Sequence, residues 1–337
     1  MSVIDLREPK DDPAVSLLEV EGLRVSFRAR TNRLGRAPRV RAVNDVSFRV
    51  DRAETVGLVG ESGSGKSTIA RAVLRLIPID AGVIRLGDDD LTRLGRAEMR
   101  QARRHAQMVF QDPYSSLDPS MVVADIVGES LGVHDRTRSR ADRHRRVGEL
   151  LDQVGMSRRH LQRYPYEFSG GQRQRIAIAR AIATNPKLVV CDEAVSALDV
   201  STQNQIINLL EDLQHELGIA YLFISHGLAV VRHISRRVVV LYLGQVMESG
   251  PTERIFAAPS HPYTRALLSA VPVADPDRQR ERRRIILTGD PPDPTNLPPG
   301  CPFAGRCPEV IDRCLTSRPA LTPVDGGGEV ACHLRAG

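Results

Sequence analysis

The hydrophobic positions of this chain form two kinds of segment. Predominantly apolar runs occupy residues 55–59, 188–191 and 220–225, as expected for short strands of a parallel sheet that is covered on both faces. Residues 69–74 and 172–184 instead place apolar side chains at helical spacing. Buried strands and helices in this mixture predict an α/β fold.

The segments on either side of the apolar runs predict further structure. Residues 17–50 predict antiparallel strands around an arginine-rich insertion at 28–41, and a charged helical pattern from about 91 to 175 predicts a helical subdomain. Residues 238–249 predict a hairpin that turns at Gly244.

The C-terminal part of the chain differs in composition. A last helix is predicted to begin at His261, and the proline-rich stretch 291–300 then marks a linker. We therefore divide the chain into a flexible N-terminus (1–16), a main domain (17–268) and a C-terminal extension (269–337).

A phosphate-binding loop lies between the first apolar run and the helical pattern that follows it. Its glycines let backbone N–H groups face phosphate oxygens at the positive end of the helix. Lys66 would contact the β- and γ-phosphates, and the Ser67 hydroxyl would be a ligand of Mg²⁺. Only three of the 47 basic side chains are lysines, which favours this role over a plain surface loop. The predicted nucleotide-binding residues here are Gly60, Glu61, Ser62, Gly63, Ser64, Gly65, Lys66, Ser67 and Thr68.

A second glycine motif, Ser169-Gly170-Gly171-Gln172, repeats this arrangement without a lysine. Its hydroxyl and amides lie at a predicted helix N-terminus, where an anion is stabilised. A simple helix cap would explain Ser169 but not two consecutive glycines followed by Gln-Arg-Gln-Arg. With Phe168 in front, the motif resembles the signature of ATP-binding-cassette (ABC) ATPases, whose usual first residue is Leu. The resemblance implies that Ser169, Gly170, Gly171 and Gln172 contact the ATP held by a second subunit in a head-to-tail dimer.

The resemblance also implies catalytic roles for residues at the ends of the apolar runs. Asp192 and Glu193 follow the run 188–191, at the edge where parallel sheets place their ligands. Asp192 would hold Mg²⁺ through water, and Glu193 would be the general base. His226 would be the switch histidine that senses the γ-phosphate, although Gly227 replaces the Asp that often follows it.

Three further residues match the family at other positions. Gln111 corresponds to the Q-loop glutamine, which links Mg²⁺ and the attacking water to the membrane partner. Asp199 belongs to the D-loop, which communicates across the dimer. Phe27 lies where the family places an aromatic ring under adenine, and packing within the first strand is the alternative.

From about residue 18 to residue 334 the chain resembles the ATPases of oligopeptide and dipeptide importers, most clearly in the segments 111–119, 191–201, 300–308 and 331–334. This resemblance implies a P-loop NTPase of the ABC cassette type, with a RecA-like core, an antiparallel β-subdomain, a helical subdomain that carries the signature, and a small cysteine-containing extension. It implies ATP and Mg²⁺ as cofactors, and as partners two transmembrane permease subunits, a second ABC ATPase (a copy or a paralogue) and, indirectly, a substrate-binding protein.

Composition limits the alternatives. The first ten residues contain no apolar core of a signal peptide, and no apolar stretch reaches the roughly 18 residues of a membrane span. We therefore expect a peripheral protein on the cytoplasmic face of the plasma membrane. The net charge is +6, but aromatic residues make up only 4% of the chain, which leaves little material for stacking bases, and no nucleic-acid partner is expected.

Four of the five cysteines lie in the extension, at Cys301, Cys307, Cys314 and Cys332. Their gaps do not match the paired spacing of zinc ribbons, and a reducing compartment disfavours disulfides. Four thiolates can hold an iron–sulfur cluster, and some relatives are thought to hold one here. A [4Fe-4S] cluster, zinc and no metal are the three alternatives.

Other functions of the ABC class fit the sequence less well. ABC ATPases of DNA repair or chromosome structure carry long coiled coils or zinc modules, and no sustained heptads occur here. Ribosome-associated members have two cassettes per chain, whereas this chain has one. Within the importer class, the cargo alternatives to peptides are nickel, glutathione and sugars.

Overall fold

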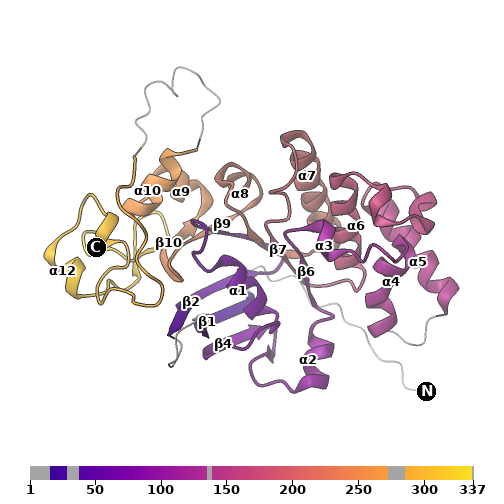
Figure 1. Ribbon diagram of the computed structural model, residues 1–337, viewed down its shortest axis with the longest axis horizontal. Helices are drawn as coiled ribbons and strands as arrows, with labels where there is room; N and C mark the ends of the chain where they lie inside the picture. Colours follow the sequence, from indigo (N-terminus) through magenta and orange to yellow (C-terminus); the bar gives the residue numbers. More distant parts are fainter. Residues whose placement is uncertain (1–15, 29–37, 135–138, 272–284, 336–337) are drawn as a thin grey trace.

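The computed structural model describes residues 16–28, 38–134, 139–271 and 285–335. Most of the predicted flexible N-terminus (1–16) and of the arginine-rich insertion (28–41) therefore lies outside the described residues. The described part forms an elongated molecule in which the helices α4–α6 lie at one end and the C-terminal extension at the other (Figure 1).

A mixed sheet forms the centre of the molecule, with strand order β11-β12-β10-β9-β3-β8-β7-β6. Neighbouring strands from β9 to β6 are parallel, and β10 runs antiparallel to β9. The predicted hairpin at Gly244 is the β9–β10 connection. The strands are β3 (Thr55–Val59), β6 (Ala106–Val109), β7 (Leu188–Asp192), β8 (Ala220–Ile224), β9 (Arg237–Tyr242), β10 (Gln245–Pro251), β11 (Thr322–Pro323) and β12 (Glu329–Val330).

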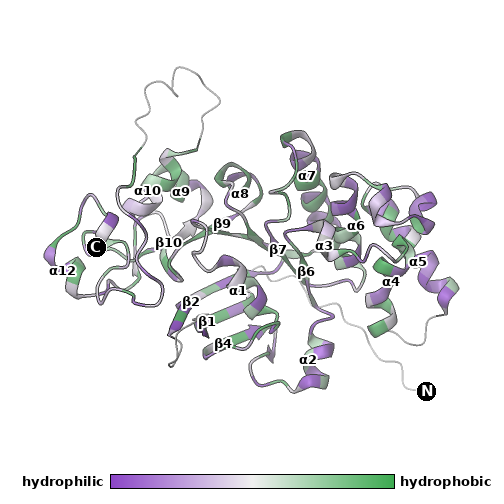
Figure 2. Cartoon of the chain, viewed as in Figure 1, coloured by the Kyte–Doolittle hydropathy of each residue, from purple (hydrophilic) through white to green (hydrophobic). Residues whose placement is uncertain are grey.

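The inner strands of this sheet are buried on both faces. In β7, for example, Val189 and Cys191 join one hydrophobic cluster, whereas Leu188 and Val190 join the cluster on the opposite face. This arrangement explains why the strand is an uninterrupted apolar run rather than an alternating one. Figure 2 accordingly shows mainly hydrophobic residues (green) in the central strands and more hydrophilic residues (purple) in the outer helices.

One face of the central sheet is covered by α1 and a second, antiparallel sheet with strand order β2-β1-β4-β5. Here β1 and β2 pair along most of their length, as the pattern of residues 17–50 predicts. The elements are β1 (Ser16–Arg28), β2 (Arg39–Asp51), α1 (Lys66–Val73), β4 (Ala81–Leu86) and β5 (Asp89–Asp90).

The predicted helical segment from about 91 to 175 is divided differently in the structure. It contains α2, whose Met99 and Ala102 pack in the same cluster as α1, and β6, which pairs with β7 in the central sheet. Only the part after β6 forms the helical subdomain. Its elements are α3 (Pro113–Ser116), α4 (Val123–His134), α5 (Arg140–Gln153), the 3₁₀ helices η1 (Arg158–Gln162) and η2 (Pro165–Glu167) and the start of α6 (Gly170–Ile182), with α2 (Arg96–Ala102) outside it.

The C-terminal extension completes the central sheet. Strand β12 pairs with β10 through Val330, which is fully buried, and the Ala331 amide donates to the Met247 carbonyl at 2.9 Å. The remaining helices are α7 (Val200–Leu217), α8 (Leu228–Ile234), α9 (Thr252–Ala257), α10 (Pro262–Ser269), η3 (Ala304–Arg306) and α12 (Asp312–Thr316). The extension is therefore continuous with the main domain rather than a separate lobe.

Candidate functional site

The predicted phosphate-binding loop joins β3 to α1 and depends on glycine at two positions. Gly60 and Gly65 have positive φ angles of 155° and 98°. A Cβ on Gly60 would lie 2.2 Å from the Leu241 carbonyl oxygen, and one on Gly65 would lie 2.3 Å from that of Ala42. No other residue fits at either position, so the loop is closely held between β2 and β9.

Lys66, the first residue of α1, folds back over this loop. Its Nζ donates hydrogen bonds to the carbonyl oxygens of Gly60 (2.8 Å) and Glu61 (2.9 Å). Burial lowers the pKa of Lys66, and the carboxylates of Glu193 and Asp192 oppose that shift. Lys66 is thus placed inside the loop that is predicted to hold phosphates.

The predicted Mg²⁺ ligands also come together. The Ser67 hydroxyl donates to Oδ1 of Asp192 at 2.9 Å, across from α1 to the end of β7. Burial raises the pKa of Asp192, and the hydrogen bond from Ser67 works against that shift. A hydroxyl and a carboxylate at the head of the loop suit Mg²⁺, which takes oxygen ligands and completes its shell with water and phosphate oxygens. The donor set therefore fits this ion.

The three predicted catalytic residues meet at one oxygen atom. Gln111 Nε2 donates to Oε2 of Glu193 at 2.7 Å, and His226 Nδ1 lies 3.5 Å from the same oxygen. Glu193 follows β7, His226 lies two residues after β8, and Gln111 lies two residues after β6, so the edge shared by parallel strands brings them together. These residues and the phosphate-binding loop line a cavity of about 360 Å³, which we call the P-loop cavity. Its lining is Ala42, Ser62, Gly63, Gly65, Lys66, Ser67, Thr68, Gln111, Glu193 and His226.

The second glycine motif lies away from the P-loop cavity, at the start of α6 (Figure 1). Ser169 and Gln172 form a reciprocal cap, in which the Gln172 amide donates to Ser169 Oγ (3.4 Å) and the Ser169 amide to Gln172 Oε1 (3.1 Å). Gly171 packs against Thr202 of α7, whose N-cap is Asp199. The structure thus brings the predicted signature together with the predicted D-loop residue and not with the phosphate-binding loop of the same chain.

Phe27 lies near the end of β1, opposite Val40 of β2. Its side chain is 42% exposed, so it does not pack in the core of the strand, and it is not part of the P-loop cavity lining. Its contact with adenine stays a prediction.

Comparison with known proteins identifies the family to which the chain belongs. The profile of the ABC transporter family matches residues 43–196, and that of the oligopeptide/dipeptide transporter C-terminal region matches residues 247–314. A probable peptide ABC transporter ATP-binding protein of Sinorhizobium fredii is 52% identical over 299 residues, which are 89% of this chain and 84% of the relative. The chain belongs to the ATP-binding proteins of ABC transporters.

Other ABC proteins are similar to this chain along most of its length. A putative oligopeptide transport ATP-binding protein of Bacillus subtilis is 46% identical, over 94% of this chain and 95% of the relative. Among solved structures, a dimeric ATP-binding cassette bound to ADP and phosphate is similar with a TM-score of 0.62 and 27% identity, and it covers 70% of this chain and 98% of that one. The cbiO1 cassette of Clostridium perfringens has a TM-score of 0.62 and 26% identity, with 72% and 91% covered.

These findings confirm the predicted fold class and enzyme class. The chain is an ABC ATPase that hydrolyses ATP, with the hydrolysis coupled to transport. In the part of the chain that the structure describes, no helix has the length and apolar character needed to cross a membrane.

Two residues of the C-terminal region contact the phosphate-binding loop, and sequence analysis did not identify either of them. The Glu61 amide donates to the Tyr263 hydroxyl at 3.0 Å, and Arg306 Nη1 pairs with Glu61 Oε2 at 2.9 Å. Tyr263 and Arg306 lie 202 and 245 residues from Glu61 in the chain. No local motif or periodicity connects positions so far apart.

The cysteines of the extension lie near one another without forming a metal site. Burial, together with the nearby thiols of the other three cysteines of the extension, raises the pKa of Cys301 to about 11, so the four sulfurs lie in one region. Among the described residues, however, no three His, Cys, Asp or Glu side chains are arranged to hold a metal ion. This arrangement of the described side chains therefore does not fit the iron–sulfur cluster or the zinc that the sequence allows.

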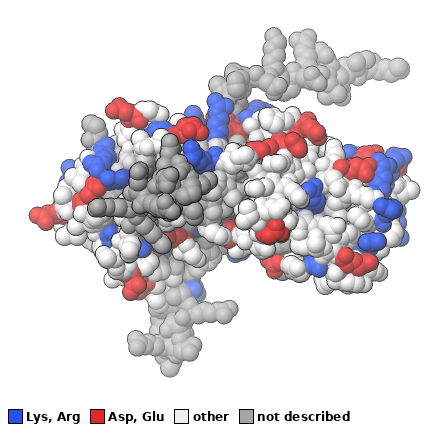
Figure 3. All heavy atoms as spheres, turned by 90° about the horizontal axis from the view of Figure 1, so that it is seen from above, with Lys and Arg blue, Asp and Glu red and all other residues white. Residues whose placement is uncertain are grey.

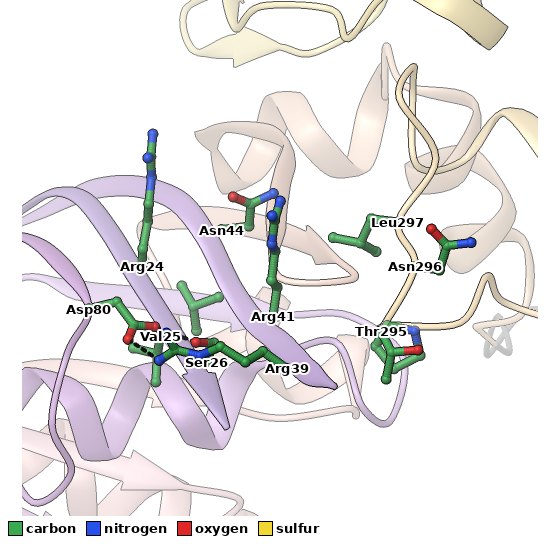
Figure 4. Close-up of a pocket in the computed structure, with 12 residues that line it drawn as sticks. Arg24, Val25, Ser26, Arg39, Arg41, Asn44, Asp80, Thr295, Asn296 and Leu297 are labelled. Carbon is green, nitrogen blue, oxygen red and sulfur yellow. Dashed lines mark hydrogen bonds and ion pairs between the residues drawn. The ribbon is translucent and has the colours of Figure 1, made fainter. Parts of the chain in front are cut away.

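A second cavity, of about 600 Å³, lies between the β1–β2 edge and residues 294–297 (Figure 4). Arg24 and Arg39 at this cavity are paired with Asp45 (3.3 Å) and Asp80 (2.7 Å). These ion pairs neutralise much of its positive charge. None of the predicted site residues lines it.

Proposed function

We propose that this ABC ATPase is the energy-coupling subunit of an importer for oligopeptides or dipeptides, acting through separate membrane subunits. The observation that carries the proposal is the match of residues 247–314 to the oligopeptide/dipeptide transporter C-terminal region. Relatives named as peptide import or oligopeptide transport ATP-binding proteins, 46–52% identical over most of the chain, support it.

Hydrolysis in this proposal uses the residues around the P-loop cavity. Glu193 accepts a proton from the attacking water, and Gln111 and His226 orient that water because both already contact Glu193 Oε2. Lys66 exchanges its loop carbonyl partners for phosphate oxygens when ATP enters. Ser67 and Asp192 would hold Mg²⁺, which would supply electrostatic stabilisation of the transferring phosphoryl group.

Two chains are needed to complete each site. Within one chain the signature residues 169–172 lie away from the P-loop cavity, and the solved cassette with ADP and phosphate is a dimer. In our proposal, the signature and Asp199 of one ATPase face the ATP of the other. ATP closes the pair, and hydrolysis lets it separate.

The motion is passed to the membrane subunits beside Gln111. A hollow of about 310 Å³ lies between the central sheet and the helical subdomain, lined in part by the exposed apolar side chains Leu76, Phe110 and Val133. Phe110 precedes Gln111 directly. In our proposal, an apolar segment of a permease subunit covers these side chains at the cytoplasmic face of the membrane. Figure 3 shows acidic and basic side chains interspersed over another face of the molecule, with basic ones gathered toward the end formed by the helical subdomain.

Reconstitution tests the cargo. The chain is assembled with its two membrane subunits and its second ATPase in vesicles, and ATP hydrolysis is measured with the binding protein loaded with di- or oligopeptides. We expect peptide-loaded binding protein to stimulate hydrolysis several-fold over the empty binding protein. Stimulation by a nickel, glutathione or sugar ligand with no response to any peptide would contradict peptide import and leave the ATPase assignment intact.

A further inference from the structure

Tyr263 of α10 and Arg306 of the C-terminal extension both contact Glu61 of the phosphate-binding loop. We propose that Tyr263 and Arg306 are positioning residues: they hold the phosphate-binding loop in the conformation that binds ATP. This inference rests on the proposed function and adds to it a role in ATP binding for Tyr263 and for Arg306 of the extension. We call Tyr263 and Arg306 together the Glu61 clamp.

Each end of the clamp is held firmly. Arg306 is only 10% exposed and also donates to the Tyr242 hydroxyl at 3.3 Å. The rings of Tyr242 and Tyr263 pack 4.7 Å apart, and the buried Phe303 packs 5.4 Å from each of them. Phe303 lies directly before η3, which ends at Arg306. The guanidinium and the phenol are therefore fixed by a common aromatic cluster.

Glu61 is held through all three of its polar groups. Its amide donates to Tyr263, its carboxylate pairs with Arg306, and its carbonyl accepts from Lys66 Nζ at 2.9 Å. The clamp thus fixes the part of the loop from which Lys66 must move to reach phosphates. A loop that already has its bound shape loses less conformational freedom on binding, which favours affinity.

Arg306 also balances the charge of Glu61. Glu61 lies beside Lys66, whose Nζ donates to the Glu61 carbonyl oxygen at 2.9 Å. Without Arg306, a carboxylate would remain uncompensated within the loop that receives the triphosphate, and like charges repel. Loss of the clamp should therefore weaken ATP binding both by loosening the loop and by adding negative charge.

The test uses three single variants of the full chain. Tyr263→Phe removes only the hydroxyl and keeps the ring in the aromatic cluster, Arg306→Ala removes the ion pair, and Arg306→Lys keeps the charge. Arg313→Ala is the matched control, because Arg313 is an exposed arginine of the same extension. For each protein, the dissociation constant of a fluorescent ATP analogue, KM and kcat for ATP, and the melting temperature are measured.

We expect Tyr263→Phe and Arg306→Ala to raise the dissociation constant and KM about fivefold, in the range for one lost hydrogen bond, with kcat within about twofold of the unchanged chain. Arg306→Lys should recover part of the loss, and Arg313→Ala should match the unchanged chain. Adding Glu61→Gln to Arg306→Ala should restore affinity in part, because it removes the uncompensated carboxylate.

Two results would overturn the clamp. One is an unchanged affinity for the analogue in both Tyr263→Phe and Arg306→Ala, with or without a lower melting temperature, since that would leave the extension a purely structural role. The other is a fall in kcat with unchanged affinity. Failure of the unchanged chain itself to bind or hydrolyse ATP would instead contradict the proposed function.

Discussion

Glu193 has a positive φ angle of 50°, one of the few such angles at a non-glycine residue of the described chain. Such a conformation costs about 1–3 kcal/mol and persists only where the surroundings hold it. Here the Glu193 amide donates to the Ile224 carbonyl at 2.9 Å, and Gln111 and His226 lie at its carboxylate. The backbone is thus fixed so that this carboxylate enters the P-loop cavity.

At this residue we predict the effect of Glu193→Gln, which keeps the shape of the side chain and removes the base. Hydrolysis should fall about 100-fold or more, the usual contribution of a general base, while the dissociation constant for ATP stays within about twofold. Phosphate release and ATP-analogue binding measure the two effects. Glu216→Gln, at an exposed carboxylate of α7, is the control. Normal turnover by Glu193→Gln would contradict the assignment of Glu193 as the general base.

The buried histidine at the start of α10 predicts a pH dependence of stability. Burial lowers the pKa of His261 to about 3, whereas an unfolded histidine titrates near 6.5. Between these values the unfolded state binds the extra proton, so stability falls as the pH falls below about 6.5. His261 also accepts from the Tyr263 amide through Nδ1, at 3.0 Å.

His261→Asn should remove this pH dependence, because Asn keeps an N-cap acceptor but does not titrate. Between pH 7.5 and pH 5 the unchanged chain should lose about 2 kcal/mol more of its free energy of unfolding than the variant. Urea unfolding at the two pH values measures the difference. His215→Asn, at an exposed position, should behave like the unchanged chain, and equal losses in all three proteins would refute the prediction.

The residues that meet at the P-loop cavity could be located from the sequence because each lies in a local motif or at the end of an apolar run. Asp192, Glu193 and His226 follow buried strands, and the common edge of parallel strands places such positions together. Tyr263 and Arg306 could not be predicted in the same way. Arg306 lies beside Cys307, in a segment where the cysteines were the only recognised feature. No pattern near residue 306 indicates a contact with Glu61.

At the scale of elements, the buried strands and main helices match the sequence pattern, and the short strands do not. Strand β6 has four residues inside a charged, helix-like segment, so its pairing with β7 was hidden by its surroundings. Strand β12 has two residues, too few for any alternation of polar and apolar positions. Both are strands because of their neighbours in the sheet rather than their own propensity.

The packing of α6 against α7 gives a prediction for the signature. An added methyl at Gly171 would lie 2.4 Å from Thr202 Cγ2, whereas one at Gly170 would lie 3.5 Å from Leu198 Cδ2, an ordinary contact. Gly171→Ala should therefore lower the free energy of unfolding by about 1–3 kcal/mol through overpacking, and Gly170→Ala should not.

Thr202→Ser provides the rescue. It removes the clashing Cγ2 but keeps the hydroxyl, which donates to Asp199 Oδ2 at 2.7 Å. The double variant Gly171→Ala, Thr202→Ser should recover most of the lost stability in chemical denaturation. A Gly171→Ala loss that persists unchanged in the double variant would show that this contact is not its cause.

At the scale of the whole molecule, the separation of the signature from the P-loop cavity predicts a change of mass. Glu193→Gln with Mg²⁺ and ATP should form a closed dimer, either with itself or with a related second ATPase, because bound ATP joins the two sites and is not consumed. Gel filtration with light scattering measures the mass. Adding Lys66→Ala, which weakens phosphate binding, should return the protein to the monomer. A monomer in every mixture would contradict the head-to-tail arrangement.

The separation of Glu61 and Arg306 along the chain also affects when the ATP site can form during protein synthesis. At about 5–20 residues per second, the 245 residues that separate them take a ribosome roughly 10–50 s to synthesise. During this time the nascent chain contains the complete phosphate-binding loop but not its distant support. A chain that ended before residue 306 would carry every nucleotide motif and still lack the arginine that holds Glu61. Assembly of a fully formed ATP site is thereby tied to nearly complete synthesis of the chain.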